Sequence, residues 1–429
     1  MVDFGEINLS KKSFINYKQF NENLYQKVIS ASSALKNKKI VHINSTENGG
    51  GVAELLISQV ALERNLGLDS HWYVIHPPKE FFVITKKIHN LLQGEDSTLD
   101  DVEQNYYLEK SKKVGDELDY FLNKEKVDLV ITHDPQPLLI GCCNLLPRVP
   151  KILRLHIDLT NPNQETLFFL KPFIEVFDKV IVSRDDFRFP WLKLDKVKTI
   201  MPAIDPLAAK NLQITDDEAW EILSRFGVRR KMPLISQISR FDKWKDPIGV
   251  IEAFKAAKEE IDNLQLVLLG LIESVDDPEA KAQVNSVLKA AKDIPDILIF
   301  YDENQLKGIA NDNFVRALQT ASDVILQKSL KEGFGLTVSE AMWKGKAVIG
   351  GNVGGIKMQI KNGEDGFLVD SIKETASKIV ELINNKAFRE IIGRRAQKTV
   401  ASKFLMPRYL LDNLEVYNKV LKIKNENFN

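Results

Sequence analysis

Short apolar runs alternate with longer stretches of helical periodicity along most of the chain. The expected strands of the first half are 39–44, 71–76, 128–133, 151–156, 179–183 and 197–201, with helices at 51–64 and 102–122 among them. The expected strands of the second half are 233–238, 264–269, 297–301, 323–327 and 347–350, and its helices are 247–259, 278–291, 313–321 and 336–343. This alternation predicts parallel sheets with helices on both faces, the α/β class.

The alternation occurs twice, and Pro202 and Pro206 interrupt it between the two halves. A chain of 429 residues also suits two domains of about 200 residues each. We therefore expect two doubly wound, Rossmann-like domains, 1–205 and 206–404, and a final amphipathic helix from Leu405 to Ile423. Ligands bind beyond the carboxyl ends of strands in such sheets, so two sheets facing each other would share one cleft.

Composition removes several classes of function. Lys+Arg and Asp+Glu are both 59, so no global field attracts nucleic acid or a membrane, and a phosphate site must be local. No apolar run approaches the roughly 20 residues that span a bilayer, and residues 1–12 lack the apolar core of a signal peptide. Cys142 and Cys143, the only cysteines, suggest buried thiols in a reducing cytoplasm.

Three glycines, Gly49 to Gly51, come between the expected strand 39–44 and the next helix. Glycine permits positive φ and close approach of the backbone, and the amides at a helix start attract an anion. A tight turn is the plain alternative, although it needs fewer glycines. The spacing is neither Gly-x-Gly-x-x-Gly nor a Walker loop, which disfavours a dinucleotide oxidoreductase and an ATPase.

Two loops of the second half carry charged residues after a strand. Arg240 and Lys245 follow the strand 233–238, where two cations suit a diphosphate leaving group that gains negative charge. Ion pairs with Asp242 and Asp246 in a solvated surface loop are the alternative. The other loop, Glu332-Gly333-Phe334-Gly335-Leu336, runs into a helix that contains Glu340.

Glu332 and Glu340 are eight positions apart, and the glycines between them allow main-chain amides to approach a ligand. A carboxylate inside the helix can hold two adjacent hydroxyls, such as those of a ribose, whereas acidic capping of a helix start is the structural alternative. His133 and His156 both end strands of the first half, while His42 and His71 are expected in the core or at an edge. None of these residues forms a pattern of metal ligands.

These motifs resemble a known family. Glu332 to Glu340 is similar to the Glu-x7-Glu element of the retaining GT-B glycosyltransferases of family 4, and Arg240 with Lys245 is similar to their Arg-x4-Lys pair. Several first-half segments look like the trehalose branch of that family, which holds glycosyltransferring synthases and retaining trehalose phosphorylases. They are 41–46, 49–54, 72–75, 85–90, 92–94, 133–137, 156–159 and 202–207.

The resemblance implies roles for individual residues. The residues expected to act in catalysis are Arg240, Lys245, Glu332 and His156. Those expected to bind the donor are Glu340, Gly333, Phe334, Gly335, Leu336, Gly50 and Gly51. Those expected to bind the acceptor are Asn48, Lys86, Asn90, His133, Asp134 and Gln136. The resemblance also implies that the final helix, 405–425, crosses back to the first domain.

The implied reaction transfers glucose from ADP-glucose or UDP-glucose to glucose and forms trehalose, with no metal and no further cofactor. The resemblance also implies front-face attack, and the sequence fits this because it shows no carboxylate pair of the glycosidase kind. A trehalose phosphorylase, a family 4 enzyme with another acceptor and a non-catalytic sugar-nucleotide-binding module are the alternatives. Ala347, Gly350 and Gly351 depart from the family pattern and leave the nucleotide preference open. A homodimer is also left open, and no nucleic-acid or stable membrane partner is expected.

Overall fold

A computed structural model describes residues 4–47, 50–139, 149–271 and 278–422. The chain divides into two compact units. Unit 1 contains the residues up to Ala203 together with those from Met406 onward, and unit 2 runs from Ile204 to Leu405. The cleft expected between the two sheets stays a prediction, as do the domain limits drawn from the sequence.

Unit 1 is built on a seven-stranded sheet in the order β1-β3-β2-β4-β5-β6-β7. Its strands are β1 (Phe4–Glu6), β2 (Lys39–Asn44), β3 (Asp69–Ile75), β4 (Leu129–His133), β5 (Lys151–Arg154), β6 (Lys179–Val182) and β7 (Val197–Thr199). Its helices are α1 (Glu22–Ser33), α2 (Gly51–Asn65), α3 (Lys79–Leu92), α4 (Asp101–Glu125), α5 (Gln164–Ile174) and α14 (Met406–Val420). All neighbouring strands are parallel except β1 and β3.

Unit 2 has a parallel six-stranded sheet in the order β10-β9-β8-β11-β12-β13. Its strands are β8 (Leu234–Ile238), β9 (Gln265–Leu269), β10 (Ile297–Phe300), β11 (Val324–Gln327), β12 (Ala347–Gly351) and β13 (Phe367–Val369). Its helices are α6 (Asp216–Leu223), α7 (Pro247–Lys258), α8 (Pro278–Ala290), α9 (Asn311–Ala321), α10 (Leu336–Trp343), α11 (Ile356–Gln359), α12 (Ile372–Asn384) and α13 (Lys386–Lys403). Numbered within the unit, this order is 3-2-1-4-5-6, the order of a dinucleotide-binding Rossmann sheet.

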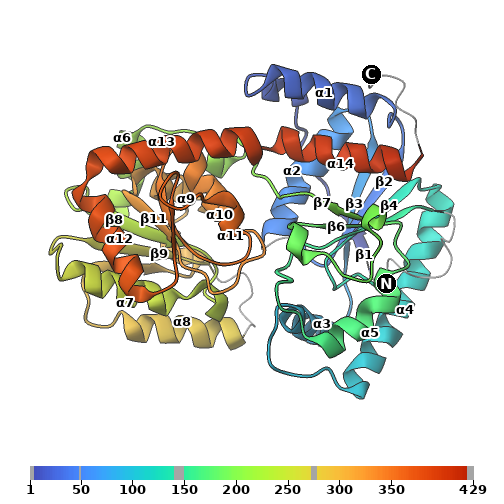
Figure 1. The fold of residues 1–429 in the computed structure, drawn as a ribbon, viewed down its shortest axis with the longest axis horizontal. Coiled ribbons are helices and arrows are strands. Elements are labelled where there is room, and N and C mark those ends of the chain that lie inside the picture. Colours follow the sequence, from blue (N-terminus) through green and yellow to red (C-terminus); the bar gives the residue numbers. More distant parts are fainter. Residues whose placement is uncertain (1–3, 48–49, 140–148, 272–277, 423–429) are drawn as a thin grey trace. The chain divides into compact units, whose positions relative to one another are not determined.

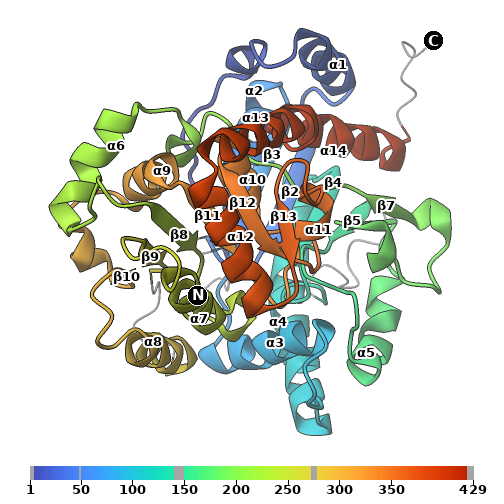
Figure 2. The ribbon, with the colours of Figure 1, turned by 60° about the vertical axis from the view of Figure 1, so that its left-hand side comes forward.

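Helices cover both faces of each sheet, so the central strands are buried throughout. In unit 1, Val41 and Ile43 of β2 belong to the cluster that includes buried residues of α3, α4 and α5. The other face packs against α2, where Leu56 and Val60 contact Trp72 of β3. In unit 2, α7 and α12 lie side by side, as do α6 and α9 (Figure 2). The predicted α/β class with two parallel sheets is confirmed.

Helix α14 belongs to unit 1 although it is the last element of the chain. It lies beside α1 and contacts α2 (Figure 1). The amide of Asn418 donates to the carbonyl of Ala31 in α1 at 2.9 Å, and the hydroxyl of Tyr417 meets Gln59 of α2. Leu410 and Leu414 are fully buried on the same face of the helix. Residues more than 350 positions apart therefore share one core.

Candidate active site

The charged loops follow the two strands at which the sheet order of unit 2 reverses. Strands β8 and β11 are neighbours, but β9 leads away from β8 on one side and β12 from β11 on the other. Two crossover connections leave this point in opposite directions and open a crevice at the carboxyl ends of the strands. Lys245 follows β8, and Glu332 follows β11. The topology therefore brings both predicted residues to the position where Rossmann sheets bind ligands.

Lys245 and Glu332 form an ion pair at this crevice. The Nζ of Lys245 lies 2.5 Å from Oε2 of Glu332, and their side chains are only 16% and 10% exposed. The hydroxyl of Ser329 donates to the same carboxylate oxygen at 3.2 Å. Arg240 differs from Lys245, because its side chain is 68% exposed and lies 3.5 Å from Asp242. An exposed guanidinium can turn toward a phosphate, whereas the Lys245 ammonium is already held beside Glu332.

Two glutamines on the neighbouring strands organise these loops. The amide of Gln237 in β8 donates to the carbonyl of Lys245 at 2.9 Å and accepts from the backbone N–H of Lys328 at 3.0 Å. Gln327 of β11 accepts from the hydroxyl of Thr337 in α10 at 3.0 Å. Lys328 in turn pairs with Asp246, the N-cap residue of α7. These buried amides fix the spacing between the loops, and the sequence analysis did not identify them.

The glycine loop before α10 has the backbone freedom that the sequence predicted. Gly335 is the N-cap residue of α10 and has a φ of 83°, in the left-handed region that other residues avoid. The side chain of Gln359 in α11 donates to the carbonyls of Phe334, at 2.5 Å, and Gly335, at 3.2 Å. It also accepts from Ser339 at 2.5 Å. Gln359 thus fixes the position of the loop, and the first amides of α10 lie at the end of the loop.

Glu340 lies in α10, as predicted, and is more enclosed than Glu332. Its side chain is 1% exposed, and its Oε1 lies 2.7 Å from the Nζ of Lys210. Gln319 of α9 donates to its Oε2 at 3.5 Å. Lys344, one turn further along, has its pKa lowered to about 8 by burial, an effect that the charge of Glu340 partly offsets. Glu340 therefore stands in a buried cluster of charges in which Lys210 is a partner that the sequence did not predict.

In unit 1 the predicted residues again follow strands at the reversal point, here β2 and β4. Gly50, with a φ of 111°, is the N-cap residue of α2, and Gly51 begins that helix. Asp134 follows β4 with a φ of 65°, a conformation that Asp tolerates better than most residues. Its Oδ1 accepts from the backbone N–H of His156 at 2.6 Å. Burial raises the pKa of Asp134 to about 7, although that hydrogen bond and Arg154 act in the opposite direction.

The remaining acceptor-binding predictions are spread over unit 1. The imidazoles of His133 and His156 are joined by a 3.0 Å hydrogen bond. The Oε1 of Gln136 is buried and has no partner among the residues that the structure describes. Lys86 is exposed on α3, and Asn90 lies one turn further along. Asn48 lies outside the described residues, as do Cys142 and Cys143.

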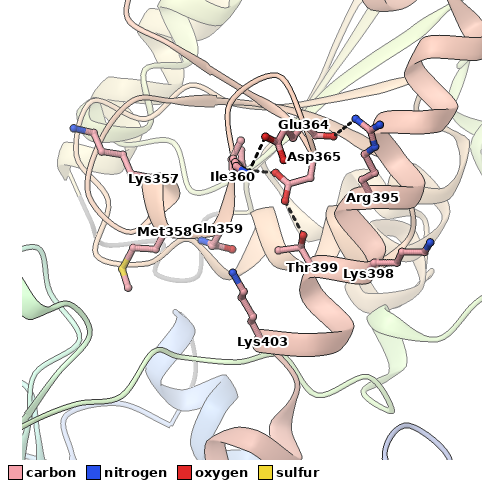
Figure 3. A pocket seen from close by; sticks show the side chains of 11 residues that line it. Lys357, Met358, Gln359, Ile360, Glu364, Asp365, Arg395, Lys398, Thr399 and Lys403 are labelled. Carbon is pink, nitrogen blue, oxygen red and sulfur yellow. Dashed lines mark hydrogen bonds and ion pairs between the residues drawn. The ribbon is translucent and has the colours of Figure 1, made fainter.

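A separate hollow of about 500 Å³ lies in unit 2, between α11 and α13 (Figure 3). Cationic side chains dominate its lining, which includes Lys357, Lys361, Arg395, Lys398 and Lys403. Asp365 is held in its wall by the hydroxyl of Thr399, at 2.7 Å. None of the residues predicted for the active site lines this hollow. Within the described chain, no group of three or more His, Cys, Asp or Glu side chains is arranged to hold a metal, and no helix is long and apolar enough to cross a membrane.

Comparison with known proteins bears on both units. Residues 42–189 match the family model for the N-terminal domain of trehalose synthase, and residues 218–399 match glycosyl transferases group 1. The chain is 37% identical to the trehalose synthase of Rubrobacter xylanophilus, over 97% of this chain and 99% of that protein. It is 39% identical to the trehalose synthase of Pyrococcus horikoshii, over 98% and 99%. The chain belongs to the trehalose synthase family. It is a glycosyltransferase.

A more distant relative and two solved structures are also similar to this chain. Trehalose phosphorylase of Grifola frondosa is 28% identical over 85% of this chain but only 55% of that protein. The sucrose-phosphate synthase structure from Thermosynechococcus elongatus has a TM-score of 0.71, with 16% identity over 90% of this chain and 100% of that one. The structure of Anabaena HepE in complex with UDP and glucose has a TM-score of 0.65, with 15% identity over 90% and 100%. At these identities the structures show the fold alone, which is GT-B.

Within the trehalose synthase family fold, the departures at the end of β12 have a steric reason. A Cβ on Gly351 would lie 2.1 Å from the carbonyl oxygen of Ser329, and one on Gly350 would lie 2.5 Å from Ile356. Gly355 is similarly confined, because its Cβ would lie 2.3 Å from the Cα of Phe334. The small residues let β12 and the following turn pack directly against the loops that carry Ser329 and Phe334. Gly350 and Gly351, which depart from the family pattern, thus allow the close packing that holds the loops of the candidate site in place.

Proposed function

We propose that this family member transfers glucose from ADP-glucose or UDP-glucose to the anomeric hydroxyl of glucose, with retention of configuration, and forms α,α-trehalose. The observation that carries the proposal is the pairing of Lys245 with Glu332 at the reversal point of the unit 2 sheet. The relatives of this chain that are named trehalose synthase support trehalose as the product. The UDP and glucose bound by HepE support a nucleotide sugar as the donor.

In this proposal the residues of unit 2 serve the donor. Arg240 and Lys245 neutralise the negative charge that builds on the diphosphate as the glycosidic bond breaks. The amides that begin α10 and the Glu332 carboxylate face the transferred glucose, and Glu340 holds the ribose. A leaving phosphate oxygen takes the proton of the attacking hydroxyl on the same face of the sugar. The protein supplies position and charge, and no enzymic nucleophile or metal ion is invoked.

Unit 1 serves the acceptor in this proposal, and its His156 also contacts the transferred glucose near the reacting face. His156 and Asp134 follow neighbouring strands and are joined through a backbone hydrogen bond. The Oε1 of Gln136 is buried without a partner among the described residues, and a site for sugar hydroxyls would leave such an atom open until the ligand binds. Gly50 and Gly51, at the start of α2, present main chain to the donor phosphate as well as to the acceptor. Together these groups offer acceptors and donors to a neutral, hydroxyl-rich ligand.

Product analysis with purified protein tests the proposal. Glucose would be supplied with ADP-glucose, UDP-glucose or glucose 1-phosphate in separate reactions, each with and without EDTA. We expect trehalose and free nucleoside diphosphate from at least one nucleotide sugar, unaffected by the chelator. Turnover of glucose 1-phosphate but of neither nucleotide sugar would replace the proposal by a phosphorylase, the activity named for the Grifola frondosa relative. Loss of activity in EDTA, restored by Mg²⁺ or Mn²⁺, would overturn the metal-independent mechanism.

A further inference from the structure

A continuous chain of hydrogen bonds runs through the interior of unit 1 and ends at His156. The carboxylate of Glu63 in α2 lies 3.0 Å from Nε2 of His42 in β2. The Nδ1 of His42 lies 3.1 Å from Nε2 of His133. The Nδ1 of His133 lies 3.0 Å from Nε2 of His156. Glu63 and His42 are wholly buried, so the chain connects a closed interior carboxylate to a half-buried ring at the candidate site.

The register of three neighbouring strands produces this alignment. His42 of β2 pairs with Ile131 of β4, and His133 of β4 pairs with Arg154 of β5. Residues two apart along a strand point to the same face of a sheet. His133 is two residues beyond Ile131, and His156 is two residues beyond Arg154. Both therefore lie on the face of the sheet that carries His42. Successive rings are also stacked, with centroids 5.4 Å apart.

The surroundings of Glu63, at the buried end of this hydrogen-bond series, favour an ionised carboxylate. Besides His42, Glu63 accepts from Ser70 at 2.5 Å, Gln59 at 2.9 Å and the hydroxyl of Tyr417 at 3.2 Å. Burial raises the pKa of Glu63, but the interaction with His42 and the hydrogen bonds from Ser70 and Gln59 outweigh it and hold the pKa below its ordinary value. Burial raises the pKa of Tyr417, so its hydroxyl remains a donor.

An ionised Glu63 determines which nitrogen carries the proton in His42, and through it in His133 and His156. The carboxylate only accepts, so Nε2 of His42 carries a proton. When the His42 ring is neutral, it accepts at Nδ1 from Nε2–H of His133, which accepts at its own Nδ1 from Nε2–H of His156. The Nδ1 of His156, which the chain does not use, is left with a lone pair. Burial lowers the pKa of both His133 and His156 well below the ordinary value, and the positive charge of Arg154 acts in the same direction, so both rings are neutral.

One added proton reverses the direction of each hydrogen bond between the three histidines. No other reactant is needed. A proton that binds at Nδ1 of His156 releases the proton on Nε2 to Nδ1 of His133. The Nε2 proton of His133 then passes to Nδ1 of His42, which becomes an imidazolium beside the Glu63 carboxylate. The net charge of the four residues rises from −1 to 0, and Nδ1 of His156 changes from acceptor to donor.

We propose that Glu63, His42 and His133 are positioning residues that form a proton relay and determine whether His156 presents a hydrogen-bond acceptor or a donor to the sugar. The role toward the sugar rests on the proposed function, whereas the relay itself does not. The chemistry of the ligand group is that of a hydroxyl, which can meet either form of the ring. The pH at which His156 changes form is then governed by His42 and Glu63, on the far side of β4.

Other groups face the relay and remain in place in the test variants. They are Arg154 and Asp134 near His156, Ser70 and Gln59 at Glu63, and Tyr409 and Tyr417 from α14. Asp134 has a pKa of about 7 and could itself contribute to a pH profile. A variant that changes only Glu63 separates the two contributions, because the Asp134 carboxyl is retained.

The first test reads the tautomers directly, with protein labelled with ¹⁵N at its histidines. The chain has six histidines, and single variants assign their signals. At a pH about two units above the ordinary histidine value we expect Nε2–H tautomers at His42, His133 and His156. On acidification we expect one proton to enter, with His42 becoming doubly protonated as His156 changes to Nδ1–H. Independent titration of His156, or Nδ1–H at high pH, would overturn the relay.

The second test uses Glu63→Gln, which keeps the size of the side chain and removes its charge. We expect the acid limb of the pH profile of kcat/KM for trehalose formation to move down by about 1 to 3 pH units, the range for loss of a close opposite charge. His71→Gln is the matched control, because His71 is on the same sheet and pairs with Glu6 and Asp69 outside the relay. We expect its profile to match wild type.

The two tests distinguish the relay from a structural role and from failure of the proposed function. A Glu63→Gln protein that is less stable but has an unmoved pH profile would overturn the relay. If Glu63→Gln does not fold, the titration of wild-type protein decides. If wild type forms no trehalose, the proposed function fails while the ¹⁵N titration still tests the relay.

Discussion

At the scale of single residues, the candidate site depends on how charges are paired before any ligand binds. Lys245 and Glu332 are partners at 2.5 Å, so each relieves the desolvation of the other. A diphosphate would compete with Glu332 for Lys245 and would draw in the exposed Arg240. In the proposed reaction, this ion pair would keep the Lys245 ammonium in position until the diphosphate binds.

We predict that Lys245→Ala and Arg240→Ala each lower kcat by about 10²- to 10³-fold, as expected for the loss of a preorganised charge that stabilises the transition state. The effect should fall mainly on kcat, because the phosphate charge is larger in the transition state. Lys243→Ala is the control from the same loop, since Lys243 lies over the ring of Trp244. Steady-state kinetics with the preferred donor measures all three. Near-normal turnover of the first two variants would remove the diphosphate assignment.

Glu340→Gln should weaken nucleotide binding rather than the chemical step. Its buried carboxylate stands beside Lys210, one helical turn from the glycine loop, and is the group proposed to hold the ribose. We expect a raised donor KM and weaker inhibition by the product nucleotide, about 10-fold for a lost charge-assisted hydrogen bond. Pyrophosphate, which has no ribose, should inhibit the variant and wild type equally. Equal weakening for pyrophosphate would mean that the substitution disturbs the loop instead.

The raised pKa of Asp134 predicts that the stability of the protein depends on pH. Its folded pKa of about 7 exceeds the unfolded value, so the folded state retains a proton that the unfolded chain has lost. Its contribution is therefore complete below about pH 4, decreases as the pH rises to about 7 and is then constant. Asn keeps the shape, tolerates the positive φ and cannot ionise. We expect Asp134→Asn to gain stability relative to wild type across this window, by up to about 4 kcal/mol at pH 8. Denaturant unfolding at several pH values measures the difference, and a constant difference would contradict the assignment.

At the scale of elements, the sequence predicted the strands that carry the site and missed β1 and β13, each at one edge of its sheet. The strands β2, β4, β8 and β11 are central, and because both of their faces are buried they are rich in apolar residues. The strands β1 and β13 have three residues each, too few to show a period. The relay was also missed, because His42 and His133 are 91 positions apart and meet only through strand register.

Helix α14 offers a prediction at this scale, because unit 1 contains it despite its place at the end of the chain. Leu414 is fully buried, and a Leu→Ala change in such a position costs about 2 to 5 kcal/mol. We expect Leu414→Ala to increase hydrogen exchange in β2 to β7, with the amides of β8 to β13 unchanged. Ile391→Ala on α13, where the side chain is 40% exposed, should change neither set. Increased exchange in both sheets would mean that the units do not unfold separately.

At the scale of the whole molecule, the proposed chemistry is divided between the two units. Every residue proposed to bind the donor through its charge lies between Ile204 and Leu405, which is one uninterrupted stretch of chain. This unit has its own hydrophobic clusters on both faces of its sheet. Unit 1, in contrast, needs two separate stretches of chain. The family models divide the chain in a similar way, with one matching 42–189 and the other 218–399.

We therefore predict that a protein consisting of residues 204–405 folds and binds nucleoside diphosphate without unit 1. Its affinity for ADP or UDP, measured by calorimetry, should lie within about 10-fold of that of the full chain, a difference of about 1.4 kcal/mol. The same fragment should form no trehalose, because Asp134, His156 and the relay lie in unit 1. Glu340→Gln in the fragment is the matched control and should weaken the nucleotide as it does in the full chain. A folded fragment that binds no nucleotide would show that unit 1 supplies part of the donor site, and the division of donor and acceptor between the units would have to be redrawn.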